Sequence, residues 1–126
     1  SDEAALEEIV RLVGMDALSP TVRLKMEAAR SVREDFLHQL AFHEVDTYTS
    51  LHKQYLMLKL VDAYYEMALE TLEKGADIEL LVKLPVREAI GRFKYLKEEE
   101  TQQEYESILN RLSAELLESL EKEEEF

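Results

Sequence analysis

The chain has 126 residues, enough for one domain built around one hydrophobic core. It contains no cysteine, which excludes disulfides and thiolate metal sites, and its three glycines and two prolines are too few for a turn-rich β architecture. A net charge of −13 argues against a nucleic-acid-binding surface, because phosphate binding needs clustered Lys and Arg. No apolar run approaches the roughly 20 residues that cross a bilayer, so we expect a soluble chain.

Two helices joined by a tight turn are predicted at the start of the chain. Apolar residues recur at helical spacing over residues 5–13, and Gly14 is expected to end that helix. Ser19 is the expected N-cap of a second helix, with Pro20 at its first position. This pattern predicts a helical hairpin with Met15–Leu18 near its tip. The expected inward face of the second helix comprises Val22, Met26, Ala29, Val32, Phe36 and Leu40.

The helical period lapses from about Ala41 to Ser50, so we interpret this stretch as a loop. Ser50 or Thr49 is expected to cap a long third helix, which Gly75 ends. The inward face predicted for this helix comprises Leu51, Tyr55, Leu58, Tyr65, Leu69 and Leu72. Of the pair Tyr64 and Tyr65, one ring is expected in the core and one at its rim.

Three further helices are expected. Asp77 caps a short one that runs to Leu84, Pro85 begins another that ends near Tyr95, and the last covers roughly Glu99–Glu124. The positions expected to face inward on the last two are Val86, Ile90 and Phe93, then Tyr105, Ile108, Leu109, Leu112, Leu116 and Leu120.

The predicted fold class is therefore all-α: a bundle of about six helices that begins with a helical hairpin and ends with an acidic C-terminal helix. The charge is unevenly spread, because residues 97–126 hold 11 acidic and 3 basic residues, a net −8 of the total −13. We predict a helical bundle over residues 1–96 and an acidic C-terminal helix over residues 97–126 within the same domain.

No residue pattern predicts catalysis by this chain alone. A phosphate loop needs a pattern such as Gly-x-x-x-x-Gly-Lys-Ser/Thr, whereas glycines 14, 75 and 91 are isolated. The polar residues near the predicted loop could converge on a divalent metal, but solvated groups that cap helices are the favoured interpretation, and we predict no catalytic or metal-binding residue. These polar residues are His38, His43, Glu44, Asp46 and His52.

Phe42 is a large apolar residue in this polar, non-periodic loop. It either fills a local gap in the core or contacts something outside the chain. The residue pattern alone favours the core plug.

Four residue strings, in order along the chain, resemble the catalytic A (alpha) subunit of archaeal and bacterial V-type ATP synthases. Any one of them is a weak signal, but four in register are specific, and the likeness runs from about Leu6 to Tyr95. The strings are Arg33–Gln39, Ala41–Tyr48, Lys53–Tyr55 and Leu84–Tyr95.

A second resemblance concerns the predicted hairpin tip. Leu12–Ser19 is similar to the hairpin tip of the F-type β subunit, where an acidic string contacts the rotating stalk. Asp16, Leu18 and Ser19 match that string, while its other acidic positions hold uncharged residues here. The resemblance implies a stalk-contacting lever formed by Met15, Asp16, Ala17 and Leu18.

The resemblance also implies a division of labour. Phe42 matches the family's aromatic residue against adenine, and Tyr48 occupies a second aromatic position of the F-type relative. An upstream domain would hold ATP or ADP with Mg²⁺, so this chain alone would bind no cofactor and would be inactive.

The implied partners are the B subunits of the catalytic hexamer and the central stalk subunit, with no nucleic acid. Contact with the membrane would be indirect, through a complex at its cytoplasmic face.

The implied function is that of a domain in a rotary proton- or sodium-translocating ATP synthase, which couples rotation of the central stalk to ATP synthesis or hydrolysis. The alternative is a non-enzymatic helical module that binds a protein partner through its acidic C-terminal helix. A phosphate loop encoded upstream in the same reading frame would favour the first interpretation over the second.

Overall fold

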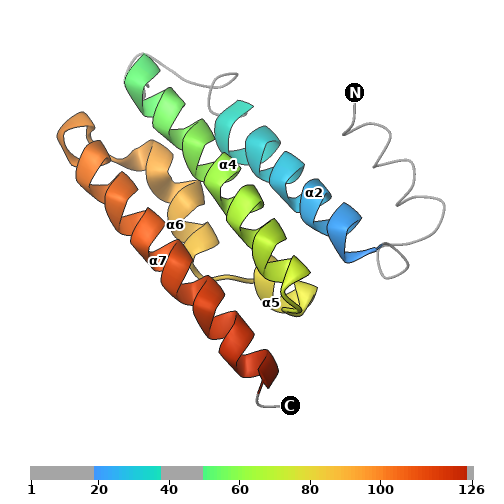
Figure 1. The fold of residues 1–126 in the computed structure, drawn as a ribbon. Helices are drawn as coiled ribbons and strands as arrows, with labels where there is room; N and C mark the ends of the chain where they lie inside the picture. The colour runs from blue at the N-terminus through green and yellow to red at the C-terminus, as the bar shows by residue number, and fades with distance from the viewer. Residues whose placement is uncertain (1–18, 38–49, 125–126) are drawn as a thin grey trace.

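The structure, a computed structural model, describes residues 19–37 and 50–124, and all regular elements in these ranges are helical (Figure 1). The all-α prediction is confirmed. The predicted first helix, the hairpin tip and the loop lie outside these ranges. The elements are α2 (Pro20–Ser31), the π-helical η2 (Val32–Leu37), α4 (Leu51–Glu73), α5 (Ile78–Val82), α6 (Val86–Arg92), the 3₁₀ turn η4 (Phe93–Tyr95) and α7 (Glu98–Glu124).

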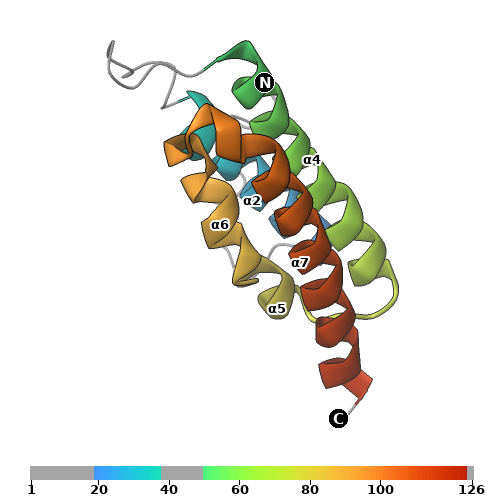
Figure 2. The ribbon, with the colours of Figure 1, turned by 90° about the vertical axis from the view of Figure 1, so that its left-hand side faces the viewer.

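Helix α4 is the centre of the arrangement, with α2 on one side and α7 on the other (Figure 1). The chain runs in one direction along α2 and α6 and in the opposite direction along α4 and α7. The short α5 packs against α2 and α7, and α6 packs against α7, beside which it lies in the turned view (Figure 2). In the described residues no helix is both long and apolar enough to cross a membrane.

The core lies where these helices meet, and it draws side chains from α2, α4, α5, α6 and α7. Ile108, Leu112 and Leu116 of the acidic helix α7 belong to the same buried cluster as the residues of α4. The largest apolar side chains that are almost fully buried are Leu24, Leu60, Tyr64, Leu81, Val86, Phe93, Ile108 and Leu112.

Most helix ends lie where the sequence predicts them. The side chains of Ser19, Ser50 and Asp77 each accept a hydrogen bond from a backbone N–H in the first turn of α2, α4 and α5. Gly75 follows α4 with a φ of +107°, a conformation that side chains with a Cβ rarely adopt. Helix α5 ends two residues earlier than predicted, at Val82.

The inward face predicted for α4 is wrong at its N-terminal half. Leu51, Tyr55 and Leu58 are 81%, 58% and 41% exposed. The buried face lies on the opposite side of the helix and includes Leu56, Leu60, Val61, Tyr64 and Ala68. Both sides of α4 are apolar, and helical spacing alone does not say which side meets the other helices.

The face predicted for α2 also differs from the observed one. Leu24, Glu27 and Ser31 are buried, whereas Val22, Met26 and Ala29 are only partly buried. Polar residues occupy the inward side because Arg87 of α6 forms hydrogen bonds with them. For α6 and α7 the predicted inward residues are confirmed, since all of them are buried or pack against the core.

Candidate functional site

Most residues singled out by the sequence for function lie outside the described ranges. These are the tip residues Met15, Asp16, Ala17 and Leu18, the aromatic residues Phe42 and Tyr48, and the polar residues His38, His43, Glu44 and Asp46. His52 is described and is exposed on α4. Over residues 19–37 and 50–124 no group of three or more His, Asp or Glu side chains could hold a metal ion.

The described elements nevertheless adjoin both predicted sites. Helix α2 begins at Pro20, two residues after the predicted tip, and passes without interruption into η2, which ends at Leu37. The N–H of Val32 donates to the carbonyls of both Ala28 and Ala29, so the backbone hydrogen bonds continue across the junction between α2 and η2. A continuous helical rod over residues 20–37 therefore lies, in the chain, between the predicted tip and the segment that carries Phe42.

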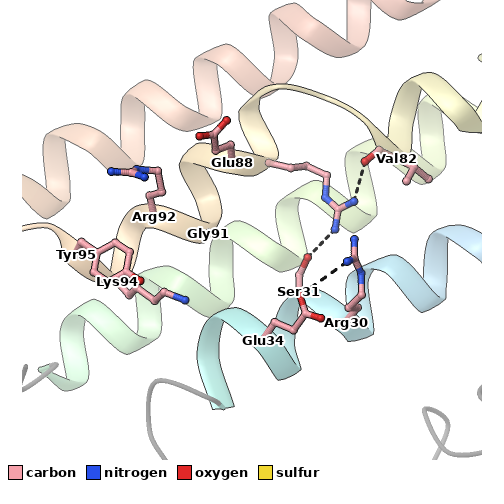
Figure 3. A pocket seen from close by; sticks show the side chains of 10 residues that line it. Arg30, Ser31, Glu34, Val82, Glu88, Gly91, Arg92, Lys94 and Tyr95 are labelled. Atoms are coloured by element: carbon pink, nitrogen blue, oxygen red, sulfur yellow. Dashed lines mark hydrogen bonds and ion pairs between the residues drawn. The ribbon is translucent and has the colours of Figure 1, made fainter. Parts of the chain in front are cut away.

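A buried ion pair fixes this rod to the rest of the bundle. Arg87 of α6 donates from Nη1 to Oε1 of Glu27 at 2.8 Å and to the carbonyl of Val82 at 2.8 Å. Its Nη2 donates to Oγ of Ser31 at 2.8 Å and to the carbonyl of Glu27 at 3.3 Å. Figure 3 shows Ser31 of α2 and Val82 of α5, two of the partners of Arg87. One side chain therefore joins α2, α6 and the end of α5.

Tyr64 of α4 completes this cluster. The guanidinium carbon of Arg87 lies 4.7 Å from the centre of the Tyr64 ring, within the range of a cation–π contact. The Tyr64 hydroxyl donates to the carbonyl of Leu81 at 2.9 Å. Burial raises the pKa of Tyr64 to about 12. All four helices around Arg87 are thus tied together by polar contacts inside an apolar core.

Glu27 remains charged in this environment. Burial by itself would raise its pKa, but hydrogen bonds from Arg87 and Arg30, together with their positive charges, outweigh burial and hold the pKa of Glu27 below its usual range. Arg30 lies 2.7 Å from the same carboxylate. The carboxylate therefore meets two guanidinium groups, one from its own helix and one from α6.

Two further contacts hold the two ends of the bundle. Near the tip end, Arg23 of α2 forms an ion pair with Glu79 of α5, and Arg23 lowers the pKa of that carboxyl. At the other end, the buried Lys53 of α4 donates from Nζ to the carbonyl of Leu96 at 2.5 Å. Burial lowers the pKa of Lys53, which the charge of Glu98 partly opposes. Lys53 thus fixes the first turn of α4, directly after the segment that carries Phe42.

A cleft of about 510 Å³ opens between α2 with η2 and α6 with η4 (Figure 3). Cationic side chains outnumber carboxylates in its lining, although the whole chain carries a net charge of −13. The cationic residues are Arg30, Arg87, Arg92 and Lys94, and the carboxylates are Glu34 and Glu88. Arg87 binds Glu27 across α6 and α2 and Arg30 binds it within α2, so two of the four cationic groups already have a carboxylate partner inside the bundle.

The sequence did not reveal the roles of Glu27, Arg87 and Lys53. Arg87 and Lys53 lie inside two of the residue strings that resemble the ATP synthase family, but nothing in those strings pairs Arg87 with a residue 60 positions away. Glu27 lies outside the inward face that the sequence predicts for α2, so the apolar spacing gave no signal of its buried partner.

Comparison with known sequences gives one family. The pattern described as the C-terminal domain of V and A type ATP synthase matches residues 1–82. Among curated relatives, the V-type ATP synthase alpha chain of Acetivibrio thermocellus is 56% identical over 115 residues, which cover 91% of this chain and 20% of the relative. The protein of the same name from Clostridium perfringens is 55% identical over 115 residues, 91% of this chain and 19% of the relative.

A third V-type ATP synthase alpha chain, from Thermoanaerobacter pseudethanolicus, is 61% identical over 97 residues, 77% of this chain and 16% of the relative. The chain thus spans about a fifth or less of the length of these relatives. An alignment over 91% of the chain also reaches into residues 97–126, beyond the four strings that carry the resemblance.

Proposed function

This chain belongs to the family of C-terminal domains of V and A type ATP synthases, as its residue strings indicated, and from that premise we propose that it transmits movement between a rotating stalk and a nucleotide site. Its parent would be the catalytic subunit of a rotary, ion-translocating ATP synthase. In that subunit the domain would couple rotation to ATP synthesis or hydrolysis without carrying the catalytic groups itself.

The observation that carries this proposal is the continuous rod of α2 and η2 between the two predicted sites. Packed helices shift as bodies and do not deform gradually, so a push at one end of the rod reaches the other end. The bonds from Arg87 to Glu27 and Ser31 couple the rod to α6, and the Arg23–Glu79 pair couples it to α5. The described helices would therefore move together as one lever.

The tip residues Met15, Asp16, Ala17 and Leu18 would contact the central stalk at the start of this rod. Phe42, with Tyr48 as a second aromatic residue, would contact the adenine at the other end, because an aromatic face suits stacking on a base. Since the binding free energies of two coupled sites depend on each other, the nucleotide state would also bias the position of the tip.

The part of the chain that the structure describes offers no group of ligands for the Mg²⁺ of the nucleotide. The sequence holds no phosphate-loop pattern, and the described residues hold no cluster of ligands for a metal. We therefore assign the phosphates, the metal and the catalytic groups to the remainder of the subunit. The B subunits and the central stalk would be the neighbours of the domain, in a complex at the cytoplasmic face of the membrane.

The test is nucleotide affinity in the assembled complex. Replacing Phe42 with Ala removes the aromatic face, so we expect the affinity for ATP or ADP to fall by about 1–3 kcal/mol, the usual range for one base–aromatic contact. Phe42→Tyr keeps that face and is the matched control, with affinity close to that of the parent. An unchanged affinity in Phe42→Ala would remove Phe42 from the nucleotide site and return it to the role of a core plug.

A further inference from the structure

The first turn of α6 is capped from another helix. Pro85 precedes α6 and makes no side-chain capping bond, unlike the residues that precede α2, α4 and α5. The N–H groups of Arg87 and Glu88 donate to the carbonyls of Leu84 and Pro85 at 3.0 and 3.1 Å. Val86 is 0% exposed, so its N–H cannot reach solvent and needs an acceptor within the protein.

Glu115 of α7 supplies this acceptor. Its Oε1 accepts a hydrogen bond from the N–H of Val86 at 2.8 Å across 29 positions of the chain. Its Oε2 lies 3.5 Å from Nη2 of Arg111, one turn back on α7. The Glu115 side chain is only 18% exposed, and a hydrogen bond to a carboxylate that is largely out of water is a strong one. Glu115 therefore does for α6 what a serine does for α2 and α4.

The capped turn also carries Arg87. The N–H of Val86 bonds to α7, whereas the guanidinium of the next residue, Arg87, bonds to Glu27 and Ser31 of α2 at 2.8 Å each. Hydrogen bonds of this kind weaken once the two atoms separate beyond about 3.2 Å, so a small shift of the turn would loosen them. The position of the first turn of α6 therefore decides how well Arg87 reaches α2.

We propose that Glu115 is a positioning residue, which holds the first turn of α6 so that Arg87 meets Glu27 and Ser31. The bond from Val86 to Glu115 fixes one side of the turn, and the bonds of Arg87 use the other. The acidic helix α7 is thereby coupled through one turn of α6 to the rod of α2 and η2. Under the proposed function, on which this consequence rests, α7 moves with the rod as part of the same lever.

Hydrogen–deuterium exchange in the full-length subunit, read by peptide mass spectrometry, tests the proposal. Glu115→Met removes the acceptor and keeps a side chain of similar helix propensity. We expect amides in the first turn of α6 to exchange at least about tenfold faster, because a hydrogen bond to a charged group is lost. Amides in the peptide that spans Glu27 and Ser31 should exchange at least about twofold faster, because Arg87 holds α2 less well.

Two further variants separate the bond from the loss of charge. Glu118→Met removes a carboxylate that is 62% exposed on the same helix, and exchange in α2 should match that of the parent. An equal increase in Glu118→Met and Glu115→Met would assign the effect to charge alone and overturn the proposal. Glu115→Gln keeps an uncharged oxygen that can accept the bond, so its exchange in α2 should lie between those of the parent and Glu115→Met. This milder variant carries the same test where Glu115→Met does not fold.

Combining the substitution with Arg87→Met distinguishes a positioning role from a general effect on stability. A positioning residue acts through the guanidinium of Arg87. In the Arg87→Met background, loss of the Glu115 carboxylate should therefore still speed exchange in the first turn of α6 but leave exchange in α2 unchanged.

Two results of this comparison would overturn the proposal. An equal increase in α2 in both backgrounds would mean that Glu115 supports the bundle as a whole. Exchange in α2 that does not change in Glu115→Met itself would confine the bond to α6. These measurements involve neither nucleotide nor stalk, so their outcome is separate from that of Phe42→Ala.

Discussion

Arg87 lies 2.8 Å from the carboxylate of Glu27 although the two residues are 60 positions apart in the chain. Their side chains are 14% and 11% exposed, so both charges sit largely out of water. Such a pair need not be more stabilising than well-packed apolar residues, but it is costly to break, because one buried charge then loses its partner. In this bundle the pair also fixes where α6 crosses α2.

Replacing Arg87 with Met should lower the free energy of unfolding by about 3–5 kcal/mol, because the carboxylate of Glu27 and the hydroxyl of Ser31 lose their buried partner. Urea denaturation of parent and variant measures the difference. The matched control is Arg111→Met, which removes a more exposed i,i+4 pair with Glu115 on α7 and should cost under about 1 kcal/mol. Equal losses in the two variants would show that the buried network is no stronger than a surface pair.

The raised pKa of Tyr64 makes stability depend on pH in the alkaline range. The pKa is about 12 in the folded chain against 10.0 for the unperturbed phenol, so the unfolded chain gives up this proton first. Stability therefore falls as pH rises from about 10 to 12, by at most about 2.7 kcal/mol for two pKa units.

In Tyr64→Phe this dependence should be absent. The variant should unfold more easily than the parent at neutral pH, by about 1–2 kcal/mol, because the bond to the carbonyl of Leu81 is lost. The gap between variant and parent should then shrink and finally change sign as pH rises from about 10 to 12, because the parent loses more than the variant's initial deficit. A gap for Tyr64→Phe that stays constant over this pH range would contradict the prediction.

Gly75 offers a test of backbone geometry free of packing effects. A Cβ added there would meet no atom within 4 Å, so the cost of Gly75→Ala comes from the φ of +107° alone. We expect a loss of about 1–2 kcal/mol in the free energy of unfolding. Gly75→Asn should lose less, because Asn tolerates positive φ better than Ala. The midpoint of urea denaturation measures the loss in both variants. An unchanged midpoint for Gly75→Ala would mean that the turn relaxes to another conformation.

Local signals predicted the helix ends well. The side chains of Ser19, Ser50 and Asp77 each accept a hydrogen bond from the first turn of the helix that follows. Residues close in the sequence are therefore enough to set where these helices begin. The glycine after α4 works in the same local way. The inward sides of α6 and α7 were also predictable, because only one side of each is strongly apolar.

What depended on distant residues was not predictable. Helix α4 has apolar residues on two sides, and only the positions of α2 and α7 decide that Leu60 and Tyr64 are buried while Leu51 and Tyr55 are not. The inward position of Glu27 on α2 makes sense only once Arg87 is beside it. The π-helical turn over Val32–Leu37 left no signal in the apolar spacing. The proposed contacts of Phe42 and the tip residues remain predictions.

The buried cluster also affects how the chain folds while it is being synthesised. Glu27 and Tyr64 leave the ribosome well before Arg87, and Ile108 and Leu112 of α7 follow later still. At about 5–20 residues per second, roughly 2–10 s pass between the synthesis of Tyr64 and that of Leu112. Until Arg87 is made, the carboxylate of Glu27 has no distant partner, and until α7 follows, the apolar side of α4 stays open. We expect the nascent domain to need a chaperone most in that interval, and to lose that need once α7 has emerged.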